Sequence, residues 1–291
     1  MRHFQRHNTM VVLGDSLDVL DHVVIDGSVN LIFADPPYNI GKKFGGSLDK
    51  WDTDAEYIEW CEKWLAICVR KLSANGSMYV MASTQSMPFL DMFLRDKITI
   101  LSRIVWCYDS SGVQARSRFG SMYEPILHCV VDEKNYTFNT DDILVEAKTG
   151  AKRGLIDYRK TIPTPYNMQK VPGNVWNFPR VRYRMMEYEN HPAQKPEALL
   201  ERIILASSNE REWVLDPFAG TFTTCAVAQR LNRQCIGIEK ELEYVKIGLR
   251  RLGVRVELDG EELTLPQKIW TKQKHKAVNN SNEQITQKFF K

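Results

Sequence analysis

The stretch EWVLDPFAGTFTTCAVAQRLNRQCIGIEKE (212–241) decides the fold class of this chain. It contains two apolar runs, 212–221 and 234–241, and a segment at 223–231 that continues the first loop as a helix. Near-continuous apolar runs are typical of strands that are covered on both faces. A strand, a helix and a second strand in succession form the unit of a parallel sheet, so the stretch predicts an α/β fold.

The same pattern recurs earlier in the chain. Apolar runs that end in polar or small-residue loops lie at 9–16, 28–39 and 76–84. A helix is predicted at 53–72, where T-x-x-E forms a capping box, and another at 196–207, which begins with proline. We therefore expect a Rossmann-like sheet with helices on both faces, in which ligands bind beyond the carboxyl ends of the strands.

Composition and cysteine usage narrow the class of protein. The chain has 291 residues, of which 43% are hydrophobic and 26% are charged, as in globular proteins with one large or two modest domains. Its six cysteines form no C-x-x-C pair, which favours buried reduced thiols over a zinc site. The N-terminus lacks the apolar segment of a secretory signal and no window has the length of a membrane span, so we expect a cytoplasmic protein.

Basic residues are concentrated in one part of the chain. Residues 148–184 contain nine Lys or Arg residues and one acid, Asp157, which gives this segment a net charge of +8. The whole chain has a net charge of +3, so the remainder has a net charge of −5. Such a segment favours a polyanion partner, and a solvated surface is the alternative. Residues 133–190 also lack a helical period and hold several prolines and aromatic residues. We predict an inserted, loop-rich module there and a basic, flexible tail at 256–291.

The loop DPFAGT (216–221) has the arrangement of an adenosine site. It follows a predicted strand and opens a helix, and Glu239 stands 19 positions after Gly220 at the end of the next strand. A glycine turn followed about 20 residues later by an acid places an adenosine ribose on a Rossmann-like sheet. The G-x-G-x-x-G of dinucleotide sites is absent, with Phe222 where a second glycine could stand, so S-adenosylmethionine fits better than NAD. A purely structural turn is the alternative.

The stretch ADPPYN (34–39) places an acid, two prolines and an aromatic ring at the end of another predicted strand. The prolines impose extended backbone and contribute carbonyl acceptors but no N–H donors. Asp35 and the Pro36 carbonyl could each accept one N–H of an exocyclic base amine while Tyr38 stacks on the base. Two such acceptors favour a pyramidal nitrogen that faces an electrophile such as a sulfonium methyl group, and this chemistry needs no metal. The alternative is a simple turn after a buried strand.

These motifs resemble those of the DNA amino-methyltransferases, in which DPPY is the catalytic motif and F-x-G-x-G the cofactor loop. The resemblance covers about Asn8 to Leu252 and follows the order of the β subgroup: DPPY, a variable basic segment, HPAQKP (191–196) and DPFAGT. Within the subgroup, the chain resembles solitary chromosomal adenine methyltransferases of enteric bacteria. The implied fold is a circularly permuted methyltransferase with a catalytic half at 1–132, a target-recognition insert at 133–190 and a cofactor-binding half at 191–255.

The resemblance also implies roles for individual residues. The implied catalytic residues are Asp35, Pro36, Pro37 and Tyr38. The implied cofactor residues are Asp15, Lys195, Pro196, Asp216, Phe218, Ala219, Gly220, Thr221 and Glu239. Phe222 departs from the family's second glycine, which implies a tighter loop or a weaker affinity for the cofactor. EPILHC (124–129) resembles a motif that helps to form the base pocket.

A base inside a duplex is out of reach of the DPPY motif, so the target must be extruded, and phosphate contacts would offset the energy required. The expected contacts are Arg116, Arg118, Lys152, Arg153, Arg159, Lys160, Arg180, Arg182 and Arg184. Asp35 rather than serine at the head of the motif favours adenine N6 over cytosine N4, in keeping with family usage. We expect sequence-specific methylation of double-stranded DNA at the bacterial chromosome, and homodimers occur in the subgroup.

Other functions stay open at this point. The same motifs would serve an N4-cytosine methyltransferase, or an enzyme that methylates RNA or a protein glutamine amide. A catalytically inactive DNA-binding regulator on the same scaffold is a further alternative. An NAD-dependent oxidoreductase is least favoured, because the glycines that approach a pyrophosphate are missing.

Overall fold

The computed structural model describes residues 2–6, 8–108, 116–117, 119–148, 153–254, 257–258 and 261–262. The strands are β1 (Arg2–Arg6), β2 (Thr9–Leu13), β3 (Val29–Ala34), β4 (Lys43–Phe44), β5 (Ser47–Leu48), β6 (Leu72–Met81), β7 (Thr99–Cys107), β8 (Tyr123–Val130), β9 (Val145–Glu146), β10 (Ile156–Asp157), β11 (Thr164–Pro165), β12 (Gln169–Lys170), β13 (Val175–Asn177), β14 (Trp213–Asp216), β15 (Gln234–Glu239), β16 (Glu257–Leu258) and β17 (Glu261–Glu262). The helices are α1 (Ser16–His22), α2 (Asp54–Lys71), α3 (Met87–Arg95), α4 (Glu197–Ser207), α5 (Thr223–Arg230) and α6 (Leu242–Arg251), with a short 3-10 helix, η1, at Asp141–Ile143.

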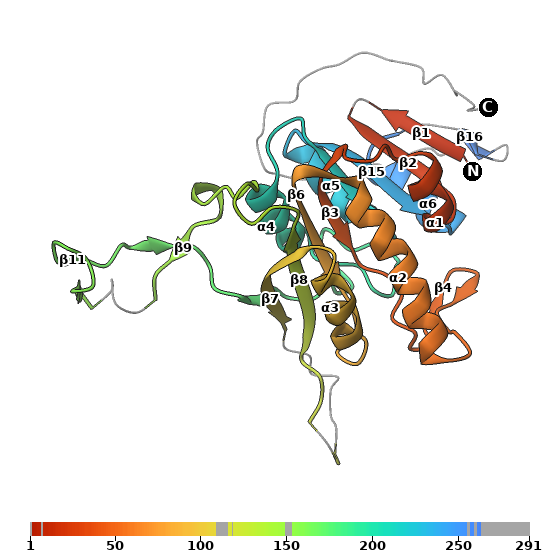
Figure 1. The fold of residues 1–291 in the computed structure, drawn as a ribbon. Coiled ribbons are helices and arrows are strands. Elements are labelled where there is room, and N and C mark those ends of the chain that lie inside the picture. The colour runs from red at the N-terminus through yellow and green to blue at the C-terminus, as the bar shows by residue number, and fades with distance from the viewer. Residues whose placement is uncertain are drawn as a thin grey trace.

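A large, mostly parallel sheet forms the centre of the fold (Figure 1). Its strand order is β1-β2-β15-β14-β3-β6-β8-β7-β13. The strands from β2 to β6 in this order run in one direction, whereas β1 and β8 are antiparallel to their neighbours. The carboxyl ends of the parallel strands therefore meet at one edge of the sheet. Because β3 pairs with β14, the ADPPYN and DPFAGT loops leave this edge next to one another.

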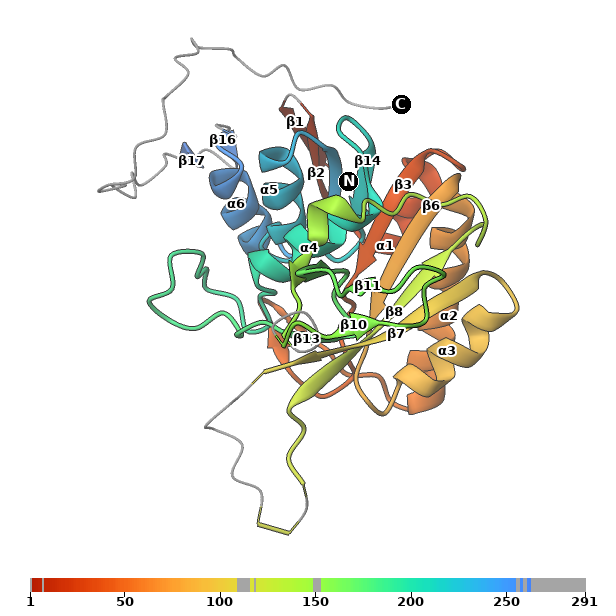
Figure 2. The ribbon, with the colours of Figure 1, turned by 90° about the vertical axis from the view of Figure 1, so that its left-hand side faces the viewer.

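Helices cover both faces of the sheet. In Figure 2, α1, α2 and α3 lie on one face and α4, α5 and α6 on the other. This double cover explains why β3 is apolar apart from Asn30. Leu31 and Phe33 belong to the core cluster under α4, whereas Ile32 and Ala34 belong to the cluster under α2. A strand that is packed on both faces gives the loop after it a fixed platform.

The predicted α/β fold is confirmed. The five predicted strands correspond to β2, β3, β6, β14 and β15, and the three predicted helices to α2, α4 and α5. Helix α2 begins at the capping box, where the Thr53 hydroxyl accepts the Glu56 N–H at 3.2 Å. All six cysteines are free and five of them are buried. None of the described helices is long and apolar enough to cross a membrane.

The segment predicted as an insert, 133–190, has a projecting middle and two packed flanks. The middle forms two narrow ribbons, β9 with β12 and β10 with β11, that extend away from the sheet in Figure 1. The flanks join the main fold: the Asn139 amide donates to the Leu205 and Ser208 carbonyls at 3.0 and 2.9 Å, and β13 pairs with β7 at the sheet edge. Most of the predicted tail at 256–291 lies outside the described residues.

Candidate active site

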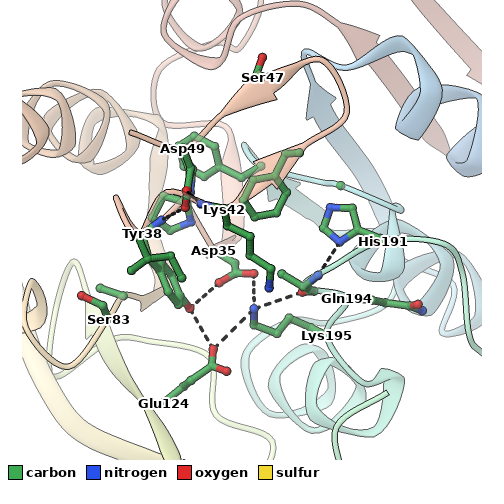
Figure 3. Close-up of a pocket in the computed structure, with 18 of the residues that line it drawn as sticks. Asp35, Tyr38, Lys42, Ser47, Asp49, Ser83, Glu124, His191, Gln194 and Lys195 are labelled. Atoms are coloured by element: carbon green, nitrogen blue, oxygen red, sulfur yellow. Dashed lines mark hydrogen bonds and ion pairs between the residues drawn. The ribbon is translucent and has the colours of Figure 1, made fainter. Parts of the chain in front are cut away.

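The loops after β3 and β14 open into one cavity at the carboxyl edge of the sheet. Its volume is about 580 Å³, and Figure 3 shows many of the side chains that line it. The lining includes all four predicted catalytic residues, Asp35, Pro36, Pro37 and Tyr38. It also includes five predicted cofactor residues: Asp15, Lys195, Phe218, Gly220 and Glu239. The fold therefore brings both candidate motifs to the same space.

Asp35 is held from two sides within this cavity. Its Oδ1 accepts the Tyr38 hydroxyl at 2.7 Å, and its Oδ2 lies 2.5 Å from Lys195 Nζ (Figure 3). The Glu124 carboxylate completes the cluster, with Oε2 at 3.0 Å from the Tyr38 hydroxyl and 3.6 Å from Lys195 Nζ. Two carboxylates thus share one hydroxyl and one ammonium group.

Burial and charge together set the protonation of this cluster. Burial raises the pKa of Asp35, and the positive charge of Lys195 opposes that rise. Burial and the two nearby carboxylates raise the pKa of Tyr38 well above its usual value. Burial lowers the pKa of Lys195, but the attraction of Asp35 and Glu124 outweighs it, so that pKa is raised overall. Lys195 is therefore a fixed cation at neutral pH.

Neighbouring segments fix the backbone of the ADPPYN loop. Tyr57 of α2 donates its hydroxyl to the Pro37 carbonyl at 2.8 Å, and the Tyr38 N–H donates to Asp49 Oδ2 at 3.2 Å. Asn39 follows in the left-handed region with φ 57°, and its side-chain oxygen accepts the Trp51 N–H at 2.9 Å. Because the two prolines donate no hydrogen bonds, these outside partners hold the loop in place.

The DPFAGT loop and the end of β15 are joined at Gly220. Its N–H donates to Glu239 Oε2 at 2.9 Å, while the Glu241 N–H donates to Glu239 Oε1 at 2.8 Å. Gly220 has φ +50°, and a Cβ atom there would stand 3.2 Å from the His191 ring. Both the backbone conformation and the available space therefore favour glycine. The His191 ring is fixed in turn by an edge-on contact with Tyr244, at 4.4 Å between centroids.

Two carboxylates flank the cofactor side of the cavity, the buried Asp216 and the half-buried Glu239, and loss of solvent contact raises the pKa of each to about 7. Glu239 lies on the cavity wall. Asp216 lies behind the loop, where its Oδ1 accepts the Phe218 N–H at 3.0 Å and its Oδ2 accepts the Thr224 hydroxyl. Glu239 is thus available to a ligand, whereas Asp216 fixes the shape of the loop.

Four predicted cofactor residues do not line the cavity. They are Pro196, Asp216, Ala219 and Thr221. All four are buried, and Pro196 is also the N-cap residue of α4. These four residues support the cavity wall from behind and do not face a ligand directly.

Asp15 and Phe218 line the same side of the cavity, and each is fixed by a local contact. The Asp15 carboxylate caps α1 by accepting the Leu17 N–H at 2.9 Å. The Phe218 ring packs edge-on against Trp64 of α2, with the ring centroids 5.1 Å apart. The cofactor side is therefore built from side chains that are already positioned.

Phe222, at the place of the family's second glycine, points away from the cavity. It has φ 59° and ψ 35°, the left-handed conformation that glycine adopts readily. Its ring is fully buried against β15 and α6, where Gly237 and Gly248 leave room for it. A Cβ atom at Gly237 would come within 2.7 Å of the ring. Phe222 therefore takes no space from a ligand.

The β4–β5 hairpin, which the sequence patterns did not predict, forms another wall of the cavity. Phe44, Ser47 and Leu48 of this hairpin belong to the lining. The Ser47 hydroxyl and the Gly46 N–H donate to the Glu241 carboxylate at 2.5 and 3.1 Å. These bonds tie the hairpin to the segment that follows β15.

Sequence reasoning assigned no role to Glu124. It grouped the EPILHC stretch as part of a base pocket, but Ile126, Leu127, His128 and Cys129 of that stretch are buried in the core. Glu124 does line the cavity. The available signal was a lone acid at the head of an apolar run, which does not by itself indicate a partner.

The predicted DNA contacts differ in their surroundings. Arg118 and Lys152 lie outside the described residues. The exposed members are Arg116, Arg153, Arg159, Lys160, Arg182 and Arg184. Arg159 is paired with Asp157, at 2.8 Å between Nε and Oδ1. Arg180 is half-buried and lines the cavity, with its guanidinium carbon 5.0 Å from the centroid of the Tyr108 ring.

Residues 29–250 match the N6_N4_Mtase family, which is described as DNA methylase. The chain belongs to this family. It is 62% identical over 253 residues to the DNA adenine methyltransferase YhdJ of Escherichia coli K12, a match that covers 87% of this chain and 85% of that protein. It is 36% identical over 230 residues to the type II methyltransferase M.HpaI of Haemophilus parainfluenzae, covering 78% of this chain and 69% of that protein.

Solved structures support the same fold. The cytosine-N4-specific PvuII DNA methyltransferase has a TM-score of 0.64 at 19% identity and covers 85% of this chain and 87% of its own. The M1.HpyAVI–SAM complex has a TM-score of 0.57 at 23% identity and covers 84% of this chain and 100% of its own. Family membership confirms the predicted methyltransferase fold and the prediction of an S-adenosylmethionine-dependent DNA methyltransferase.

Proposed function

We propose that this protein transfers a methyl group from S-adenosylmethionine to the N6 amine of an adenine extruded from duplex DNA, at a defined short sequence. The observation that carries the proposal is the shared cavity, which is lined by Asp35 and Tyr38 and also by Gly220 and Glu239. A methyl group can pass in line to an amine only where the acceptor motif and the cofactor loop face a common space.

The residues around the end of β15 fit the adenosine part of the cofactor. Glu239 would accept hydrogen bonds from the ribose hydroxyls, and such bonds favour its ionised form. Gly220 brings backbone to the cavity surface without a side chain, Asp15 and Phe218 line the same side, and Lys195 would lie near the methionine end. When bound, the cofactor supplies a methyl group already activated by its sulfonium, so the proposal needs no metal.

The ADPPYN loop would orient the target amine. The Asp35 carboxylate accepts one N–H and the Pro36 carbonyl accepts the other, while the Tyr38 ring stacks on the base. Lys195 contacts the Asp35 Oδ2 atom, so the amine and Lys195 compete for it. The Ala193 carbonyl, 3.4 Å from Lys195 Nζ, offers the ammonium group another partner.

Adenine is the proposed target for two reasons. The motif begins with Asp35, whereas in the family that it resembles a serine at this position more often marks cytosine enzymes. The relative YhdJ, at 62% identity, is named an adenine methyltransferase. The PvuII enzyme, named cytosine-N4-specific, is 19% identical and supports only the fold. N4-methylcytosine is therefore the second product that the test must detect.

Residues 133–190 are proposed to recognise DNA, between a catalytic part at 1–132 and a cofactor-binding part at 191–255. The projecting ribbons of β9 to β12 and their exposed basic residues support this assignment. The proposed phosphate contacts among the described residues are Arg116, Arg153, Arg159, Lys160, Arg180, Arg182 and Arg184. Because Arg180 lines the cavity, its proposed contact is the phosphate beside the extruded nucleotide.

Nucleoside analysis tests the proposal directly. The purified protein is incubated with methyl-labelled S-adenosylmethionine and duplex DNA, and the DNA is digested to nucleosides. We expect label in N6-methyl-2′-deoxyadenosine and none with an Asp35→Ala variant. Label confined to cytosine would refute the adenine assignment, and an unlabelled digest would refute DNA methylation. Sequencing of modified bases in DNA from expressing cells then identifies the recognition sequence.

The resemblance further suggests a homodimer at the chromosome in the bacterial cytoplasm. Light scattering with and without duplex DNA tests the oligomeric state, and fractionation of cells tests the location. Among the residues that the structure describes, no group of three or more His, Cys, Asp or Glu side chains could hold a metal ion.

A further inference from the structure

Glu124 is the second carboxylate of the cluster around Asp35, and its contacts indicate a role in the chemistry of that cluster. Its Oε2 faces the Tyr38 hydroxyl at 3.0 Å and Lys195 Nζ at 3.6 Å, and its Oε1 accepts the Tyr108 hydroxyl at 3.2 Å. The side chain is only 16% exposed. Burying a carboxylate beside another one is unfavourable. None of these contacts belongs to the regular ladders of β8, which pair it with β6 and β7.

The arrangement leaves one hydrogen between two carboxylates. The Tyr38 oxygen lies 2.7 Å from Asp35 Oδ1 and 3.0 Å from Glu124 Oε2, but a phenol has a single hydrogen and donates to one acceptor at a time. The hydroxyl can therefore accept a proton from one carboxyl group while it gives its own proton to the other. This transfer changes no heavy-atom position.

The proposed reaction produces a proton at this place. As the bond between N6 and the methyl carbon forms, the bond between that carbon and sulfur breaks, and its electron pair stays on sulfur. The nitrogen is then positively charged and must lose one proton. Asp35, which accepts an N–H of the amine, is the nearest base. A protonated Asp35 would lose its charge beside Lys195 and would no longer be ready for the next amine.

We propose that Glu124 receives this proton from Asp35 through the Tyr38 hydroxyl and so restores the Asp35 carboxylate. Glu124 is thus a positioning residue that acts through Tyr38 and Asp35, and the inference rests on the proposed methyl transfer. The proton that Asp35 takes from the amine reaches the Tyr38 side when the carboxyl group rotates. Asp35 then gives that proton to the Tyr38 oxygen as Tyr38 gives its own hydrogen to Glu124 Oε2. Glu124 lines the cavity and is 16% exposed, so its Oε2 atom then releases the proton to solvent, while its Oε1 atom stays fixed by the Tyr108 hydroxyl.

A pH profile separates this role from a structural one. Asp35 must be ionised to accept the amine, so the rate falls as the pH falls through its pKa. The titratable groups around it are Lys195, Glu124, the neutral Tyr38 hydroxyl and, more remotely, Asp216. Three influences on the pKa of Asp35 are, in order of size, burial, the charge of Lys195 and the charge of Glu124. The negative charge of Glu124 raises this pKa. Removing that charge lowers this pKa and moves the acid limb of the rate profile to lower pH.

The test is a single-turnover measurement with Glu124→Gln, with DNA and cofactor prebound, over a range of pH. We expect a rate constant about 10- to 100-fold lower, an acid limb displaced to lower pH, and dissociation constants for cofactor and DNA close to those of the wild type. Glu124→Asp should recover part of the rate. Asp91→Asn is the matched control, because Asp91 is an 11%-exposed carboxylate paired with Arg103 away from the cavity. It should leave both rate and acid limb unchanged.

Tyr38→Phe is the second variant, since it keeps the ring for stacking and removes the hydroxyl that links the carboxylates. It should reproduce the loss of rate, and the double variant with Glu124→Gln should lose little more, because both changes interrupt one route. A Glu124→Gln rate within about twofold of the wild type, an unmoved acid limb, or fully additive losses would each overturn the proposal. Wild-type protein that fails to methylate adenine would refute the proposed function instead.

Discussion

The loops after β3 and β14 lie next to one another at the sheet edge but present different groups to the cavity. The loop after β3 presents side chains: Asp35 and Tyr38 face the cavity and bond with Glu124 and Lys195. The loop after β14 instead presents backbone at Gly220, while Asp216 and Phe222 turn toward the protein interior. The loop after β3 therefore contributes charged and polar side chains to the cavity, whereas the loop after β14 contributes a backbone surface of fixed shape.

This contrast predicts different consequences of mutation. A change in the charged cluster should alter the rate of methyl transfer while the fold survives, because Lys195 keeps one carboxylate partner when the other is removed. A change behind the second loop should alter stability or cofactor affinity first, because tightly packed interiors resist added volume. The predictions below test whether the two loops separate in this way.

The largest effect is expected for Asp35→Ala. Loss of the amine acceptor should reduce the single-turnover rate of methyl transfer by roughly 10³-fold or more. Glu124 remains as a partner for Lys195, so the free energy of unfolding should fall by about 1–3 kcal/mol, less than when a buried charge loses its last partner. Calorimetric titration should give a cofactor affinity near that of the wild type. Equal losses of rate and cofactor affinity would show that the two loops do not divide their roles.

Gly248→Ala tests the packing that supports the loop after β14, because Gly248 of α6 lies against the buried Phe222 ring. Its new methyl group would overlap the Phe222 ring, so we expect a loss of about 1–3 kcal/mol in the free energy of unfolding, measured with urea. Adding Phe222→Ala should remove the overlap, so the two changes should be strongly non-additive. Gly173→Ala is the control, because nothing lies within 4 Å of a Cβ atom there. Additive effects would contradict the packing described for Phe222.

The two loops also differ in how far the sequence could predict them. Local patterns predicted the fold and both loops. These patterns are the apolar runs of β3 and β14 and the spacing from Gly220 to Glu239. Glu124 comes to Asp35 only through the pairing of β8 with β6, whose order in the sheet no local pattern encodes. The fit of Phe222 against Gly237 and Gly248 likewise depends on three segments that meet after folding.

A smaller effect is expected for the dependence of cofactor affinity on pH. Burial raises the pKa of Glu239 to about 7, and ribose hydroxyls would favour its ionised form. Binding should therefore release protons, and affinity should rise roughly three- to tenfold between about pH 6 and pH 8. Titrations in buffers of different ionisation enthalpy measure the protons released. Glu239→Gln should weaken binding and abolish this pH dependence.

Asp216 provides an internal comparison for that experiment. Its pKa is also raised to about 7, from an ordinary value of 3.8, but it does not line the cavity. A carboxyl group with a raised pKa stabilises the folded state below its unfolded pKa and loses that contribution as the pH rises through its folded pKa. The cofactor-free Glu239→Gln variant should therefore still lose stability as the pH rises toward about 7. A pH-independent stability would contradict the burial of Asp216.

The smallest effects are expected for two exposed arginines that belong to neither loop: Arg159, on the β10–β11 ribbon, and Arg184, which follows β13. Arg184→Ala should weaken DNA binding a few-fold and reduce the slope of log affinity against log salt by about one, because one phosphate contact is lost. Arg159→Ala should change the slope less, since Asp157 already neutralises that guanidinium at 2.8 Å. Fluorescence anisotropy at several salt concentrations measures both, with single-turnover rates at saturating DNA as the control. If either variant lowered that saturated rate as Asp35→Ala should, the substituted arginine would have to act on the bound base itself, and the chemistry could not be confined to the loop after β3.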